Sequence, residues 1–76
     1  MTKDGFITNL RDALEWPDGE FSATTVLAGN DRWDSVALLA AMSLVDEKLG
    51  LTLSASDLED VSTVGDLVAL VSERLD

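Results

Sequence analysis

Apolar residues recur at helical spacing near the start of this 76-residue chain. This spacing predicts a first helix from Lys3 to Glu15, with one apolar face. The members of that face are Phe6, Ile7, Leu10 and Leu14. Thr2 or Asp4 could cap the start of the helix. Pro17 limits its end, because the residue before a proline avoids the helical region.

A long connection is predicted from Pro17 to Trp33. Pro17-Asp18-Gly19 has the residue types of a tight turn, with a fixed φ, a side-chain acceptor and a permissive glycine. A loop of this length in a small protein is usually functional or held down by its own apolar residues. The residues expected to pack it against the core are Phe21, Val26 and Leu27.

The strongest helical pattern extends from Asp34 to Leu49 and ends at Gly50, a typical residue for a helix C-terminus. Its expected inward stripe is Leu38, Met42, Val45 and Leu49. Val36 and Leu39 lie off this stripe, so part of an apolar surface should be exposed. Exposed apolar surface of this kind favours a binding face.

The remaining segments are shorter. Leu51–Leu53 is expected to be an extended link, after which Ser54 or Ser56 caps a brief helix through Glu59. Thr63 should begin a last helix that continues to the C-terminus, with Asp66 completing a capping box. Its inward positions are Val64, Leu67, Val68 and Val71 or Leu75. We therefore predict an all-α, four-helix bundle of three main helices and one short helix.

Composition excludes several kinds of chemistry. The chain has no cysteine and no histidine, so it lacks a thiolate nucleophile, an imidazole base and the usual zinc ligands. Acidic residues cluster at Asp31 and Asp34 and again at Asp57, Glu59 and Asp60. Neither cluster has the spacing or the central glycine of an EF-hand loop. No metal site is expected.

Charge limits the partners. Fifteen acidic and five basic residues give a formal net charge of −10. Such a surface repels nucleic acid and favours partners with basic patches. No apolar stretch approaches the ~20 residues of a membrane span, and Met1–Phe6 lacks signal-peptide features. We expect a single domain over residues 1–76, monomeric and cytoplasmic, with no membrane insertion.

Candidate chemistry lies at Asp34-Ser35-Val36, where the most apolar helix begins. Free backbone N–H groups and the helix dipole favour a phosphate there, including one esterified to Ser35. Asp34 or Ser35 could equally be only a helix cap. The tripeptide alone does not separate the two interpretations.

The order and spacing of the motifs resemble the acyl carrier protein family over nearly the whole chain. Asp34-Ser35-Val36 is similar to the family's Asp-Ser-Leu attachment motif. Leu51–Ser54 resembles its aliphatic link into the third helix, and Val61–Leu67 resembles the entry to its last helix.

The resemblance implies that a phosphopantetheinyl transferase attaches 4′-phosphopantetheine to Ser35, with Asp34 as part of the motif. The thiol of the arm would then carry acyl groups as thioesters between acyl-transferring, ligase or synthase enzymes, in fatty-acid, polyketide or a specialised acyl pathway. The chain itself would not be an enzyme. Core residues that could also shelter an acyl chain are Leu38, Met42, Val45, Leu58, Val61 and Leu67.

The sequence departs from the family where Ala37 and Ala40 occupy positions at which acids are expected. Docking should then depend more on apolar contact, which suggests a freestanding, specialised carrier. The expected partner-binding residues are Trp33, Val36, Leu39, Ala40, Asp46 and Glu47. Trp33 has an equally weighted alternative, in which its ring covers the junction between loop and helix.

Two other functions remain open at this point. A peptidyl or D-alanyl carrier shares the fold and the modified serine, although Asp31–Ser35 differs from the Gly-Gly-His/Asp-Ser approach usual in peptidyl carriers. An acidic helical adaptor would bind its partner through Val36 and Leu39 and give Ser35 no special role.

Overall fold

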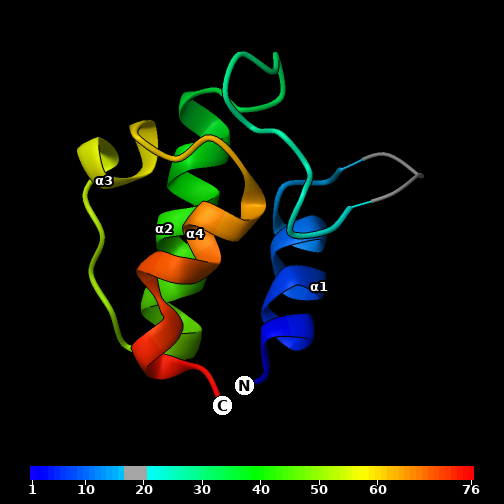
Figure 1. Ribbon diagram of the computed structural model, residues 1–76. Coiled ribbons are helices and arrows are strands. Elements are labelled where there is room, and N and C mark those ends of the chain that lie inside the picture. Colours follow the sequence, from blue (N-terminus) through cyan, green and yellow to red (C-terminus); the bar gives the residue numbers. More distant parts are fainter. Residues whose placement is uncertain (17–20) are drawn as a thin grey trace.

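A computed structural model describes residues 1–16 and 21–76. The elements are α1 (Lys3–Ala13), α2 (Ser35–Leu49), α3 (Ala55–Glu59), α4 (Val64–Leu70) and the 3₁₀ turn η1 (Ser72–Arg74). α1 packs against α2 and α4, and α3 packs on the other side of α2 (Figure 1). The described ranges contain no named strand, and the predicted all-α bundle is confirmed. The predicted turn at Pro17-Asp18-Gly19 lies outside the described residues.

The amphipathic pattern of α1 is confirmed. Phe6 and Leu10 are fully buried, and the side chain of Thr2 caps the helix by accepting from the N–H of Gly5 at 3.0 Å. The predicted end at Glu15 is wrong, because the helix ends at Ala13. Glu15 has a φ of +52°, which is incompatible with continued right-handed helix.

The core is apolar throughout the described residues, with no buried polar or charged side chain. Side chains from every α-helix and from the long connection contribute to it. Its members are Phe6, Leu10, Leu27, Ala37, Ala41, Leu44, Val45, Leu49, Leu58, Val61, Val64, Leu67, Val68 and Val71.

The inward face of α2 differs from the predicted stripe. Val45 and Leu49 are buried as expected, but Leu38 and Met42 are only half-buried. The buried positions that the prediction missed are Ala37, Ala41 and Leu44. Ala41 belongs to the same buried cluster as the side chains of α1. The alanine side of α2 therefore turns toward α1 and rotates the expected stripe partly out of the core.

Backbone hydrogen bonds join the long connection, at Val26 and Leu27, to the segment before α4, at Ser62 and Thr63. The N–H of Leu27 donates to the carbonyl of Ser62 at 2.8 Å, and Val26 forms an isolated antiparallel bridge with Thr63. Successive side chains of extended backbone point to opposite sides. Leu27 is fully buried and Phe21 half-buried, as predicted, whereas Val26 is 56% exposed and the prediction for it is wrong.

A glycine permits the closest of these approaches. The N–H of Gly65 donates to the carbonyl of Ala23 at 2.8 Å. A Cβ atom on Gly65 would lie 3.0 Å from that same oxygen, which is too close for an ordinary contact. The absence of a side chain at residue 65 therefore lets the connection lie directly on the first turn of α4 without displacement.

Both short helices begin with capping boxes. The side chain of Ser54 accepts from the N–H of Asp57 at the start of α3, so Ser54 rather than Ser56 is the cap. Thr63 and Asp66 form the predicted box at the start of α4. Asp66 Oδ2 also accepts from the N–H of Ser62 at 2.9 Å. These bonds satisfy donors that the first turn of a helix otherwise leaves without partners.

The prediction that the last helix continues to the C-terminus is wrong. α4 ends at Leu70 and the chain continues as η1. The hydroxyl of Ser72 donates to the carbonyl of Ala69 at 3.0 Å, which offers the backbone an alternative to α-helical hydrogen bonding. Val71 is nevertheless fully buried, as predicted for the inward face.

We expect Gly65→Ala to lower the free energy of unfolding by about 1 kcal/mol. Overpacking against a backbone atom costs roughly 1–3 kcal/mol. Alanine is preferred over glycine by about 1 kcal/mol in a helix interior, and this gain is smaller in the first turn. Urea unfolding followed by circular dichroism measures the difference. A variant as stable as the parent would show that the connection does not depend on this contact.

Stability should also fall in acid through Asp66. The N–H of Ser62, followed by that of Thr63, holds the pKa of the Asp66 carboxyl below its ordinary value of 3.8. A lowered carboxyl pKa stabilises the fold at pH values above 3.8. This stabilisation is lost as the pH falls through the pKa of the carboxyl in the folded state. Asp66→Ala should therefore be less stable than the parent at neutral pH and lose this disadvantage in acid.

Thermal unfolding of the two proteins between neutral pH and pH below 3.8 tests this. Glu59→Ala is the control, because the Glu59 carboxyl takes part in no capping hydrogen bond within the described residues. A difference between Asp66→Ala and parent that stays constant over the whole range would contradict the assignment.

Candidate functional site

Ser35 is the exposed first residue of α2. Asp34 precedes it as the N-cap, and its Oδ1 accepts from the N–H of Ala37 at 2.9 Å. The first N–H groups of a helix have no intrahelical acceptor, so those of Ser35 and Val36 remain available. The hydroxyl of Ser35 forms no hydrogen bond with any described residue. It is accessible to a modifying enzyme.

The electrostatic surroundings of Ser35 suit a phosphate. The first turn of α2 contains no acidic residue, although the chain as a whole carries a net charge of −10. A helix N-terminus carries about half a positive charge, and free N–H groups there bind anions. Asp34 is the one adjacent carboxylate in the motif, and its Oδ1 is occupied by the cap. The residues present therefore fit a phosphate ester on Ser35.

The approach to Ser35 is fixed by a compact turn. The carbonyl of Asn30 accepts from the N–H of Trp33 at 2.9 Å, and Asn30 Oδ1 accepts from the N–H of Arg32 at 2.9 Å. Gly29 has a φ of +77°, a conformation that side chains disfavour. Trp33 is half-buried against the core. Its ring therefore packs at the junction between loop and helix.

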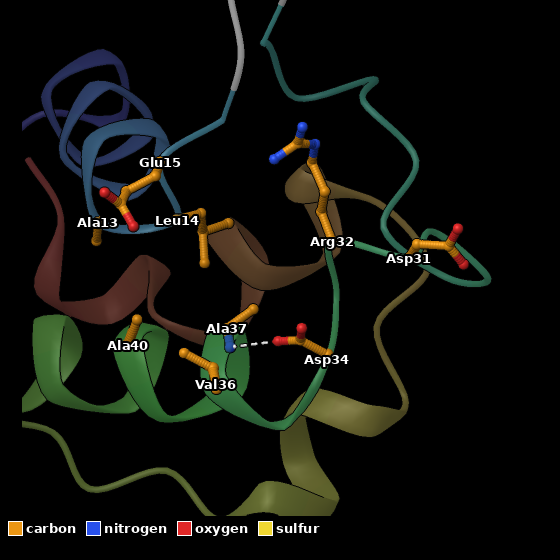
Figure 2. A pocket seen from close by; sticks show the side chains of 9 residues that line it. All are labelled: Ala13, Leu14, Glu15, Asp31, Arg32, Asp34, Val36, Ala37 and Ala40. Carbon is orange, nitrogen blue, oxygen red and sulfur yellow. Dashed lines mark hydrogen bonds between the residues drawn. The ribbon is translucent and has the colours of Figure 1, made fainter.

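A groove of about 430 Å³ lies between the end of α1 and the start of α2, and we name it the α1–α2 groove. Figure 2 shows Glu15, which follows α1, and Arg32 of the connection on opposite sides of it. The groove is lined by Ala13, Leu14, Glu15, Asp31, Arg32, Asp34, Val36, Ala37 and Ala40. Since Asp34 and Val36 both line it, Ser35 lies at its rim.

A smaller groove of about 270 Å³ lies between α2 and the extended link, and we name it the α2–link groove. It is lined by Leu39, Met42, Ser43, Asp46, Thr52 and Leu53. Ser35 is at i−4 from Leu39 and therefore on the same side of the helix. Ser35 thus lies between two grooves on different sides of α2.

The six predicted partner-binding residues are divided between two grooves and the surface around them. Val36 is 74% exposed and Leu39 is 61% exposed, but they line different grooves. The remaining four residues also differ in environment. Ala40 is half-buried in the α1–α2 groove, and Asp46 lines the α2–link groove. Glu47 is exposed, and Trp33 packs on the core.

Ala37 is only 6% exposed, so a carboxylate at this position would have to be buried. The presence of alanine at position 37, where the family resemblance leads us to expect an acid, is therefore explained by the packing of this side chain in the core. Ala40 differs, because it is half-buried and borders the α1–α2 groove. Here a small residue keeps the groove open.

Sequence reasoning missed Leu14, Glu15 and Arg32 as residues near the site. Leu14 was assigned to the core and is half-buried, but it also lines the α1–α2 groove. In the sequence, Arg32 is notable only as a member of the five-residue segment Asp31–Ser35. The proximity of these residues to Ser35 arises from the packing of α1 beside α2.

Glu15, two residues after the end of α1, has an unusual backbone conformation. Its N–H donates to the carbonyl of Asp12 at 3.2 Å. The N–H of Trp16 donates to the carbonyl of Arg11 at 3.1 Å. This is the Schellman pattern, in which the left-handed position is usually a glycine. Here a glutamate occupies it with a φ of +52°. The backbone strain places a carboxylate on the groove.

The acidic clusters do not form a metal centre in the described part of the chain. No group of three or more possible ligands lies close enough to hold an ion. Within the same residues, no helix combines the length and the apolar character needed to cross a membrane.

We expect Glu15→Gly to raise the free energy of unfolding by about 0.5 kcal/mol. The left-handed conformation costs an ordinary residue roughly 1–2 kcal/mol, and the extra chain entropy of glycine removes about half of the gain. This corresponds to an increase in melting temperature of about 2–4 °C for a domain of this size.

Thermal unfolding measures the shift. Gly50→Ala is the matched opposite change, because Gly50 has a φ of +67° at the end of α2, and it should be destabilising. If Glu15→Gly melted below the parent, contacts of the glutamate side chain would outweigh the strain.

Comparison with known proteins identifies the family. The model of a family described as phosphopantetheine attachment site matches residues 4–71, nearly the whole chain. No curated protein and no solved structure matches. Domains of this family carry 4′-phosphopantetheine on a serine and generally act as non-catalytic carriers that meet transferases and synthases. With its helical bundle and an accessible serine at the start of α2, the chain belongs to the phosphopantetheine-attachment family that includes the acyl carrier proteins.

Proposed function

We propose that residues 1–76 form a single carrier domain that holds acyl intermediates as thioesters on a 4′-phosphopantetheine arm attached to Ser35. One observation carries the proposal. Ser35 is exposed at the start of a 15-residue helix whose first turn bears no acidic residue. A negatively charged phosphate can be accepted there in a chain that is otherwise strongly acidic.

The proposed modification is a phosphoryl transfer from coenzyme A by a phosphopantetheinyl transferase. A bond forms between Ser35 Oγ and the phosphorus next to the pantetheine, and the hydroxyl proton passes to a base of the transferase. The pyrophosphate bond breaks and adenosine 3′,5′-bisphosphate leaves. Asp34 keeps the helix start in place through its bond to the N–H of Ala37. The arm, once attached, supplies the thiol that forms thioesters.

The apolar core supports an acyl cargo. The residues suggested as shelter for an acyl chain lie in the main buried cluster or pack against it, between α2, α3 and the start of α4. They are Leu38, Met42, Val45, Leu58, Val61 and Leu67. No buried polar side chain interrupts the core in the described residues, so an alkyl chain inserted there would meet only apolar neighbours.

The surface beside Ser35 supports docking to enzymes through apolar contact. Val36 and Leu39 are large, exposed apolar residues within two turns of Ser35, and Asp46 and Glu47 are exposed acids farther along α2. A partner that fits this surface offers an apolar patch near the attachment point and basic residues beyond it. Since the chain has no cysteine or histidine, we assign the chemical steps to these partners.

Intact mass after incubation with coenzyme A and a promiscuous phosphopantetheinyl transferase tests the attachment. We expect a gain of one phosphopantetheine in the parent and none in Ser35→Ala. Ser43→Ala is the matched control, because Ser43 is also an exposed serine of α2, and it should be loaded normally. No loading of the parent by several transferases would remove Ser35 from the function and favour the adaptor.

A further inference from the structure

Two grooves flank Ser35, and their sizes differ in a way that bears on the arm. Pockets for small molecules are typically about 300–1,000 Å³. The α1–α2 groove, at about 430 Å³, falls in this range, and the α2–link groove, at about 270 Å³, is slightly below it. The larger groove therefore has room for a small organic group that starts at its rim.

We infer that the α1–α2 groove is a resting site for the pantetheine part of the arm when the carrier is not engaged with an enzyme. This inference depends on the proposed attachment at Ser35. It adds that the unengaged arm turns toward α1 and lies against residues of this chain. The occupant is thus the prosthetic group itself.

The walls of the groove match the chemistry of pantetheine. Pantetheine carries a geminal dimethyl group, a hydroxyl and two amides along one chain. The floor offers apolar contact through Leu14, Val36 and Ala40. On opposite sides, Glu15 presents a carboxylate acceptor and Arg32 a guanidinium donor (Figure 2). An amide N–H of the arm can donate to the Glu15 carboxylate, and an amide carbonyl can accept from the Arg32 guanidinium.

The charges of the groove favour a neutral occupant. Three carboxylates, those of Glu15, Asp31 and Asp34, and one guanidinium, that of Arg32, line it. An anionic ligand would be repelled by the excess of negative charge. The amide-rich part of the arm is uncharged, and its single phosphate remains at Ser35, beside the acid-free first turn of α2.

The open shape of the groove depends on small side chains and on the backbone at Glu15. Ala13, Ala37 and Ala40 are small residues that line it, and a longer side chain at Ala40 would project into the space. The strained backbone of Glu15, with a φ of +52°, sets the carboxylate on the wall. Local strain that is kept at one position often serves a binding role.

Backbone amide chemical shifts of the ¹⁵N-labelled protein before and after loading test the inference. Intact mass first establishes that Ser35 is loaded, so a failure of attachment is distinguished from a failure of the groove and would overturn both. We expect loading to shift the amides of Leu14 and Glu15, which follow α1 and are far from Ser35 in the sequence. Changes confined to residues 33–38, or changes at Thr52 and Leu53 instead, would overturn the inference.

Two variants identify the cause of the shifts. Ala40→Leu should abolish the changes at Leu14 and Glu15 while Ser35 is still loaded, because leucine fills the groove. Ala69→Leu, at an exposed alanine of α4, is its control and should retain them. Persistence of the changes in folded, loaded Ala40→Leu would overturn the inference.

Should Ala40→Leu fail to fold, Arg32→Ala provides the same test at an exposed side chain. We expect it to weaken the changes at Leu14, since the donor for the arm is lost. Arg74→Ala, at an exposed arginine of η1, is the matched control for the change in charge. Equal changes in the two arginine variants would contradict a role for Arg32.

Discussion

The hydrogen bonds between the long connection and the chain entering α4 are the constraint on which the rest of the structure depends. The N–H of Val64 donates to the carbonyl of Thr25 at 3.0 Å, and the N–H of Leu27 donates to the carbonyl of Ser62 at 2.8 Å. Because Leu27 is also fully buried, the connection is held by polar and apolar contacts together. Without this attachment, nothing local would determine where the turn before Ser35 lies relative to α1.

The alanine side of α2 serves two purposes. Ala37 and Ala41 are buried and allow α1 to pack beside α2, while Ala40 borders the groove next to the attachment residue. The larger apolar residues Val36 and Leu39 are left in solvent, where they add little to stability. The first half of α2 thus buries alanines and exposes two larger apolar residues, which is unusual in a globular protein, whereas its second half buries Leu44, Val45 and Leu49 in the ordinary way.

Local signals in the sequence were sufficient for most of the fold. The capping box of Thr63 and Asp66, the end of α2 at Gly50 and the position of Ser35 all follow from residue types within a few positions of one another. The orientation of α2 did not follow, because Val36 to Met42 is apolar on every side. Periodicity has no polar face to choose from there, and packing against α1 makes the choice.

The groove beside Ser35 was beyond prediction for a related reason. It requires the end of α1, the turn at residues 31–34 and the first turns of α2 to meet in space. The left-handed Glu15 that shapes one wall carries no signal of its own, since glycine is the residue that normally marks such a position. The proposed attachment motif is recognisable from neighbouring residues in the sequence, but its surroundings in space are not.

The short helix α3 has a consequence for how the molecule opens. It has five residues, far fewer than an isolated helix needs for stability, and Leu58 is its only buried side chain. Its capping box at Ser54 and Asp57 is exposed to solvent. The free energy needed to detach α3 should therefore be much smaller than that of global unfolding. Detachment of α3 would therefore expose the apolar interior at a lower cost in free energy than separation of α1, α2 and α4.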